Sequence, residues 1–150
     1  MKKTLFFIFV AAAFGLNAQV CFTAHADYIA GTNPNAILSG DFNKDGFPDL
    51  VCNNGGTNEV LVYFGDGTGT YPATGNSYTT AMIPQGMCMG YFNLDTFPDI
   101  AVTFAGGGGI SVLLNDSAGG FGPFANYYGG GNPQSVTSAD FNLDGFTDLA

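Results

Sequence analysis

The sequence has almost no basic residues. Three lysines, no arginine and one histidine stand against twelve acidic residues. Lys2 and Lys3 lie at the extreme N-terminus, so Lys44 is the only strong base in the rest of the chain. Proteins that bind nucleic acid neutralise phosphates with a basic patch, and anionic membrane surfaces attract the same kind of charge. The composition therefore excludes a nucleic-acid footprint and gives no support for electrostatic attachment to a membrane.

Groups that do chemistry are also scarce. His25 is the only histidine and lies near the N-terminus, which makes a role as a general base improbable. No serine, cysteine or threonine stands in a recognisable nucleophile constellation, and the acids outside the motif described below are too scattered to pair as acid and base. We therefore predict that the visible chain is not an enzyme, and we nominate no catalytic residue.

Cysteine is limited to Cys21, Cys52 and Cys88, without zinc-binding spacing. An odd number in an exported chain leaves room for one disulfide, and the sequence does not decide which pair would form it. In the repeats described below, Cys52 aligns with Val102 and Cys88 with Leu38. Positions that exchange with valine and leucine favour small core hydrophobes at Cys52 and Cys88.

The chain has no apolar run long enough to cross a bilayer, which takes about 20 residues. Its longest run, residues 5–16, follows Met1-Lys2-Lys3 and ends before Asn17-Ala18. This order is typical of a secretory signal peptide, so we predict a leader over residues 1–18, export to the cell surface or medium, and no transmembrane segment in the mature chain. Lipidation at Cys21 is a weaker alternative, because Val20 replaces the small residue usual before a lipidated cysteine.

What the sequence does contain is a motif in three copies. Residues 41–49 read Asp-Phe-Asn-Lys-Asp-Gly-Phe-Pro-Asp, with oxygen-bearing side chains at positions 1, 3, 5 and 9 and a glycine at position 6. Related stretches follow at residues 91–99 and 140–148, and the three hold eight of the twelve acids. Asp, Asn and Gly are also ordinary turn residues. The repeated spacing and the concentrated charge favour Ca²⁺, which takes six to eight oxygen ligands.

An EF-hand is disfavoured, because position 12 is Cys52 instead of glutamate and no helix flanks the motif. The similarity extends beyond the loops, which divides the chain into an N-terminal segment (19–27), two repeats (28–77 and 78–126) and a shortened third (127–150). Each repeat carries strand signals: in the first, residues 36–38, 49–52, 59–64 and a short strand around Thr70-Tyr71. We predict an all-β fold of about four antiparallel strands per repeat, as in a propeller or solenoid.

The loop Asp-Phe-Asn-x-Asp-Gly-x-x-Asp-Leu and the hairpin Val-x-Val-x-Phe-Gly-Asp-Gly-x-Gly at residues 60–69 resemble the FG-GAP or VCBS repeat family. The family forms the β-propeller of integrin α-chains and of many bacterial surface proteins. The resemblance implies a structural Ca²⁺ in each intact loop. Its implied ligands are the side chains of Asp41, Asn43, Asp45 and Asp49 with the carbonyl of Phe47, and those of Asp140, Asn142, Asp144 and Asp148 with the carbonyl of Phe146.

The second loop departs from the family pattern. Tyr91 replaces the first aspartate and Thr96 replaces the glycine, which removes a carboxylate and puts a β-branched residue where positive φ is expected. Asn93, Asp95 and Asp99 remain. We therefore expect this loop to bind Ca²⁺ weakly or not at all.

The aromatic residues of the repeats are expected to pack. Phe42, Phe92 and Phe141 follow the first position of each loop, and we predict that they lie between blades. Tyr28, Tyr78 and Tyr127 could offer platforms for stacking sugars, but repeated aromatics are packing residues first.

Two repeats and the start of a third make an incomplete ring, because seven blades of about 50 residues need about 350. We therefore expect the sequence to be an N-terminal portion that exposes sheet edges and aggregates alone. The function we expect is a secreted or cell-surface, calcium-stabilised propeller that binds an extracellular protein or glycan, as in adhesion. The alternative is a non-catalytic portion of an extracellular enzyme acting on polysaccharide or phospholipid.

Overall fold

The computed structural model describes residues 27–150. The predicted signal peptide, Cys21 and His25 lie outside this range. Between residues 27 and 150 the chain forms ten strands and no helix. No helix in this part of the chain is therefore long and apolar enough to cross a bilayer.

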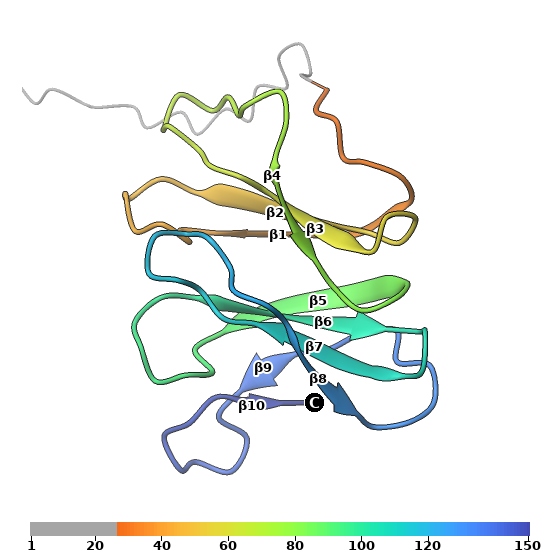
Figure 1. Ribbon diagram of the computed structural model, residues 1–150. Coiled ribbons are helices and arrows are strands. Elements are labelled where there is room, and N and C mark those ends of the chain that lie inside the picture. The colour runs from red at the N-terminus through yellow and green to blue at the C-terminus, as the bar shows by residue number, and fades with distance from the viewer. Residues whose placement is uncertain (1–26) are drawn as a thin grey trace, which may run out of the picture.

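The strands form two four-stranded antiparallel sheets and one two-stranded sheet, each in chain order (Figure 1). The first sheet contains β1 (Pro34–Gly40), β2 (Asp49–Asn54), β3 (Glu59–Tyr63) and β4 (Asn76–Thr79). The second contains β5 (Pro84–Gly90), β6 (Asp99–Phe104), β7 (Gly109–Leu113) and β8 (Ala125–Tyr128). The third contains β9 (Ser138–Ala139) and β10 (Asp148–Leu149). The predicted all-β fold of four-stranded blades, with a third one begun, is confirmed.

The predicted fourth strand of the first repeat was misplaced. Thr70 and Tyr71 are not in a strand, and β4 begins at Asn76 and pairs with β3 through Val60 and Tyr78. The glycine-rich turn does not close a tight hairpin: Gly67 and Gly69 have positive φ, and the chain then passes Pro72, which has no N–H for a ladder. The predicted repeat boundaries after residues 77 and 126 fall inside β4 and β8.

A bulge recurs at the same place in both complete sheets. The register between β1 and β2 shifts between Pro34 and Ile37, and that between β5 and β6 shifts between Pro84 and Met87. In the first sheet, Asn53 Oδ1 accepts hydrogen bonds from the amides of Asn35 and Ala36, at 3.2 and 2.8 Å. A buried side chain therefore satisfies the amides that the bulge removes from the ladder.

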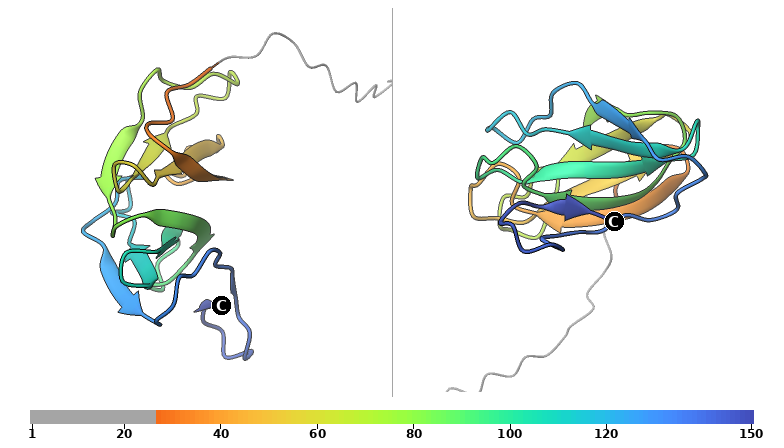
Figure 2. Two further views of the ribbon diagram at one scale, coloured as in Figure 1. Left: turned by 90° about the vertical axis from the view of Figure 1, so that its right-hand side faces the viewer. Right: turned by 90° about the horizontal axis from the view of Figure 1, so that it is seen from below.

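The core lies between the first two sheets, which follow one another along the molecule (Figure 2). Phe42 is fully buried there, as predicted. The cluster joins both sheets through Phe42, Val51, Val60, Val62, Met87, Ile100, Val102, Leu113 and Phe121. Burying side chains of this size stabilises a fold by about 1.5–3 kcal/mol each.

A second, smaller cluster lies on the far side of the second sheet. It contains Cys88, Ala101, Val112 and Val136, with Phe92 packed against it, which confirms the packing role of Phe92. Phe141 is 55% exposed, so its predicted packing is wrong. Its counterparts each pack against a following sheet, and no sheet follows β9 and β10 in the described part of the chain.

Cys52 and Cys88 are both buried and free. Burial raises the pKa of both thiols above the ordinary value, which makes them poor nucleophiles at neutral pH. Their predicted role as small core hydrophobes is confirmed.

Candidate metal-binding loops

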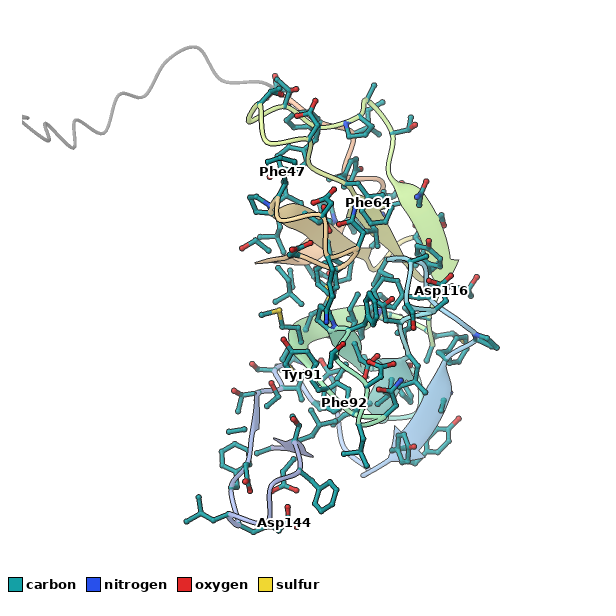
Figure 3. All side chains as sticks on the ribbon, turned by 90° about the vertical axis from the view of Figure 1, so that its left-hand side faces the viewer. Phe47, Phe64, Tyr91, Phe92, Asp116 and Asp144 are labelled. Atoms are coloured by element: carbon teal, nitrogen blue, oxygen red, sulfur yellow. The ribbon has the colours of Figure 1, made fainter. Side chains whose placement is uncertain are left out.

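The three motif loops connect the first and second strand of each sheet and lie along one edge of the molecule. Figure 3 labels Phe47 of the first loop, Tyr91 of the second and Asp144 of the third, from one end of that edge to the other. The blade architecture therefore sets the loops in a row at intervals of one repeat.

In the first loop, three side chains gather around one turn of backbone. The amide of Asp45 donates to Asp41 Oδ1 and to Asn43 Oδ1, both at 3.1 Å, and the amide of Gly46 donates to Asp41 Oδ2 at 3.0 Å. The amide of Phe47 donates to Asp45 Oδ1 at 2.9 Å. This close turn requires positive φ, which is 58° at Lys44 and 89° at Gly46.

The third loop repeats this arrangement. The amide of Asp144 donates to Asp140 Oδ1 at 3.0 Å and to Asn142 Oδ1 at 2.9 Å, and that of Gly145 donates to Asp140 Oδ2 at 2.8 Å. The amide of Phe146 donates to Asp144 Oδ1 at 2.9 Å. The φ of Gly145 is 89°, as in Gly46. The first and third loops thus present the same oxygens at positions 1, 3 and 5.

Asp49, at position 9, has different surroundings from the other three oxygen-bearing residues of its loop. It is fully buried, and its two carboxylate oxygens accept from the amides of Phe42 at 2.8 Å and Gly65 at 3.0 Å. Burial raises the pKa of the Asp49 carboxyl above its ordinary value, although both amides act in the opposite direction. Its carboxylate therefore ties the start of the loop to the end of β3.

The second loop keeps this tie and loses the rest in part. Asp99 is buried, and its oxygens accept from the amides of Phe92 and Asn115, both at 2.8 Å. Burial raises the pKa of this carboxyl too. Asp95 and Asn93 retain their turn bond of 3.1 Å. Tyr91 is 50% exposed and provides no carboxylate, so the two amide bonds made by Asp41 have no counterpart.

The backbone of the second loop also differs. Leu94 has a φ of 65°, like Lys44 before it, but Thr96 is not among the residues with positive φ. The β-branched side chain explains the difference, because the left-handed region is costly for such residues. The sequence argument that Thr96 changes the turn is therefore supported by the backbone.

The oxygens at positions 1, 3 and 5 fit a hard cation. Asp41 and Asn43 each place an oxygen 3.1 Å from the same amide nitrogen, and Asn43 Nδ2 lies 2.8 Å from Asp45 Oδ2, so the three side chains are in contact. Two carboxylates and an amide oxygen are ligands of the kind that Ca²⁺ takes. Phe47 stands at the exit of the turn, as Phe146 does in the third loop.

No three His, Cys, Asp or Glu side chains gather as a metal-holding group within residues 27–150. Two features of the loops account for this arrangement. Position 3 is an asparagine, and the carboxylate at position 9 already accepts from backbone amides. The fit therefore rests on positions 1, 3 and 5, and the role of Asp49 as a ligand stays a prediction.

Asn115 is a residue that the sequence argument missed. Its Nδ2 donates to the carbonyls of Phe42 at 2.9 Å and Pro98 at 3.1 Å, and its Oδ1 accepts from the amides of Ser117 and Gly119. It thus links the first loop to the second. The signal was present in the alignment of the repeats, where Asn115 stands opposite Gly65 at the start of a turn.

Lys44 provides a second link between these loops. Its Nζ lies 4.5 Å from the centroid of the Phe97 ring, so the strong base of the first loop lies over the aromatic ring at position 7 of the second. Together with Asn115, this contact couples the positions of the two loops.

The FG-GAP-like repeat family matches the chain twice, at residues 41–102 and 91–150. The two matches overlap, and together they run from the first motif loop to the last residue of the sequence. No curated protein and no solved structure shows a significant match.

Proposed function

Because the chain belongs to the FG-GAP-like repeat family, we propose that it forms part of a secreted or cell-surface β-propeller in which Ca²⁺ fastens the blades. The family indicates a propeller-like module of an extracellular type, and the repeated four-stranded sheets agree with that. Export through the leader at residues 1–18 belongs to this proposal.

The observation that supports calcium is the arrangement of positions 1, 3 and 5 in the first and third loops. Asp41 and Asp45 bring two exposed carboxylates around one turn, where their negative charges repel each other. When bound, Ca²⁺ supplies positive charge and replaces weak contacts with several metal–oxygen bonds. Asp41, Asn43 and Asp45 would hold it in the first loop, and Asp140, Asn142 and Asp144 in the third. Its role would be structural.

The propeller would serve as a binding module for an extracellular protein or glycan, as in adhesion. The observations that support binding over catalysis are the membership of the family and the location of the motif acids. These acids are engaged with loop amides and set along one edge, and none of them faces a nucleophile. The mechanism we propose is that calcium fixes the loops, the loops fix the first two strands of each blade, and the blades present the binding surface.

A calcium titration of the full chain tests this proposal. We expect two sites by calorimetry, and a stabilisation of about 2.7 kcal/mol per site at a calcium concentration 100 times the Kd. Asp41→Ala should remove one site. Asp66→Ala is the matched control, because Asp66 lies in an exposed turn outside the motif and should leave both sites intact. A thermal midpoint that calcium does not raise would overturn the proposal, as would two sites persisting in Asp41→Ala.

A further inference from the structure

A groove with a volume of about 470 Å³ lies on the far side of the second sheet, beside β10. Its floor is the face of β7 and β8 that points away from the first sheet. The apolar side chains that line it include Phe92, Ile110, Val112, Leu114, Tyr127 and Leu149. Tyr127 is 63% exposed and Leu114 is 41% exposed, so the floor is only partly covered.

The lining of this groove repeats a surface that is covered elsewhere in the same molecule. One repeat earlier, Phe92 corresponds to Phe42 and Tyr127 corresponds to Tyr78. The apolar residues of β7 correspond in the same way to those of β3. In the first sheet, the equivalent residues are Phe42, Val60, Val62, Phe64 and Tyr78, all within or against the core cluster.

The cover of that earlier surface is a short segment of the second repeat. Phe121 packs edge-on against Phe42 and Tyr78, with ring centroids 5.9 and 5.3 Å apart. Leu113 joins the same cluster, and Asn115 Nδ2 donates to the carbonyl of Phe42. A leucine, an asparagine two residues later and an aromatic residue six beyond that make these contacts.

Two polar features of the groove lack the partners that their counterparts have. Asp49 and Asp99 each accept from two backbone amides, and the second comes from the residue after the third strand. Asp148, which also lines the groove, accepts from the amide of Phe141 at 3.1 Å, and the described residues offer no amide after a third strand. Similarly, β2 and β6 pair on both sides, while β10 pairs with β9 alone.

We infer that the groove binds a β-strand and its following turn from another polypeptide, with a leucine, an asparagine and an aromatic residue at the spacing of Leu113, Asn115 and Phe121. The strand adds to the free edge of β10 through backbone hydrogen bonds, the mode known as β-augmentation. Its leucine fills the space over Ile110 and Val112, and its aromatic ring packs between Phe92 and Tyr127. The amide of its asparagine donates to Asp148.

The probe is a labelled peptide with the sequence of residues 109–124, titrated into the full chain and followed by fluorescence anisotropy. We expect saturable binding. Leu113→Asp or Phe121→Ala in the peptide should each weaken it at least about tenfold, because both side chains enter the groove. Val112→Thr in the peptide is the control: Val112 lies on the opposite face of β7 from Leu113 and should change the affinity less than about threefold.

Variants of the chain test the same site from the other side. Tyr127→Ala should weaken peptide binding at least about tenfold, while the neighbouring Tyr128→Ala should not, since Tyr128 packs on Phe104 outside the groove. Absence of saturable binding to the folded chain would overturn the proposal, and so would equal effects of the two tyrosine variants. A dimer that Tyr127→Ala dissociates, in the absence of peptide binding, would assign the groove to a second copy and also overturn it.

Discussion

The first and second motif loops share one half of their hydrogen bonds and differ in the other. Asp49 and Asp99 make the same pair of bonds, with the amide seven residues earlier in the chain and with the amide that follows the third strand. The carboxylate of Asp41, which accepts from two amides of its own turn, has no counterpart at Tyr91.

This difference separates two roles within one motif. Position 9 connects the loop to the third strand and is retained in a loop that has lost its first carboxylate. Positions 1, 3 and 5 shape the turn and present oxygens to the solvent. The blade therefore depends on the ninth residue, and metal binding depends on the first, third and fifth.

The largest effect should come from removing the ninth residue. Asp49→Ala and Asp99→Ala each leave two backbone amides without their acceptor inside the protein. At about 1–3 kcal/mol per buried unsatisfied group, each variant should lose about 2–6 kcal/mol of unfolding free energy. Chemical denaturation without calcium measures this loss.

The matched control for this pair is Asp148→Ala. Asp148 is partly exposed and accepts from the single amide of Phe141, so its loss should be less than half of that in Asp99→Ala. If Asp49→Ala were costly and Asp99→Ala silent, the two loops would not share a structural ninth position, and the comparison would fail.

Restoring the second loop should have the next largest effect. Tyr91→Asp with Thr96→Gly returns the carboxylate and the glycine that the first loop has at positions 1 and 6. We expect a third calcium site, with a further stabilisation of about 2.7 kcal/mol at 100 times its Kd. Calorimetry gives the number of sites and thermal melting gives the stabilisation.

The control for the restored loop is Tyr91→Phe with Thr96→Gly, which repairs the turn without adding a carboxylate. It should bind no third ion. Should it bind one as well, glycine instead of charge would be what the second loop lacks.

The fold was predictable because its signals are local and occur more than once. The runs at residues 49–52 and 59–64 are rich in β-branched and aromatic residues, and the 50-residue period indicated that each sheet would need a neighbour. The fourth strand was misplaced because the loop before it, including Pro72 and Tyr71, carries no alternating pattern. The hydroxyl of Tyr71 donates to the carbonyl of Pro48, a contact that no local rule predicts.

The candidate site was predictable as a set of residues but not as an arrangement. Spacing identified the oxygens at positions 1, 3, 5 and 9 and treated them as equals. The fact that Asp49 is buried between two amides depends on where β3 ends, which is a contact over 16 residues. The link made by Asn115 depends on the packing of one sheet on the next, over 73 residues. Long-range contacts of this kind are not encoded in motif spacing.

A smaller effect should follow from relieving backbone strain that only the second repeat has. Ile83 has a φ of 61°, where its counterpart Asn33 has 55°. Asparagine tolerates this region and a β-branched side chain does not, so Ile83→Asn should stabilise the protein by about 1 kcal/mol. Ile83 is 44% exposed, which limits the apolar burial lost. The reverse change, Asn33→Ile, should destabilise it by a similar amount, and equal stability of both variants and the parent in thermal melts would exclude strain at this position.

The smallest effect should be a pH dependence that belongs to the first sheet alone. Glu59 accepts hydrogen bonds from the hydroxyls of Ser77 and Thr57, which hold the pKa of its carboxyl below the ordinary value. Its counterpart in the second sheet is Gly109, which has no side chain to titrate. Since the folded pKa is below the unfolded value of about 4.3, the stabilisation is complete above that pH and is lost as the pH falls through the folded pKa.

Because Glu59 is partly exposed, we expect less than about 1 kcal/mol from this carboxylate. Denaturation between pH 7 and 3 should therefore show a shallower loss of stability in Glu59→Gln than in the parent, and Ser77→Ala should fall between them. Asp49 and Asp99 contribute with the opposite sign, because burial raises their pKa, and their contribution is common to all three proteins. The difference between parent and variant thus isolates Glu59. An unchanged slope in Glu59→Gln would mean that the two hydroxyls do not favour the charged form, and that the two sheets respond to acid in the same way.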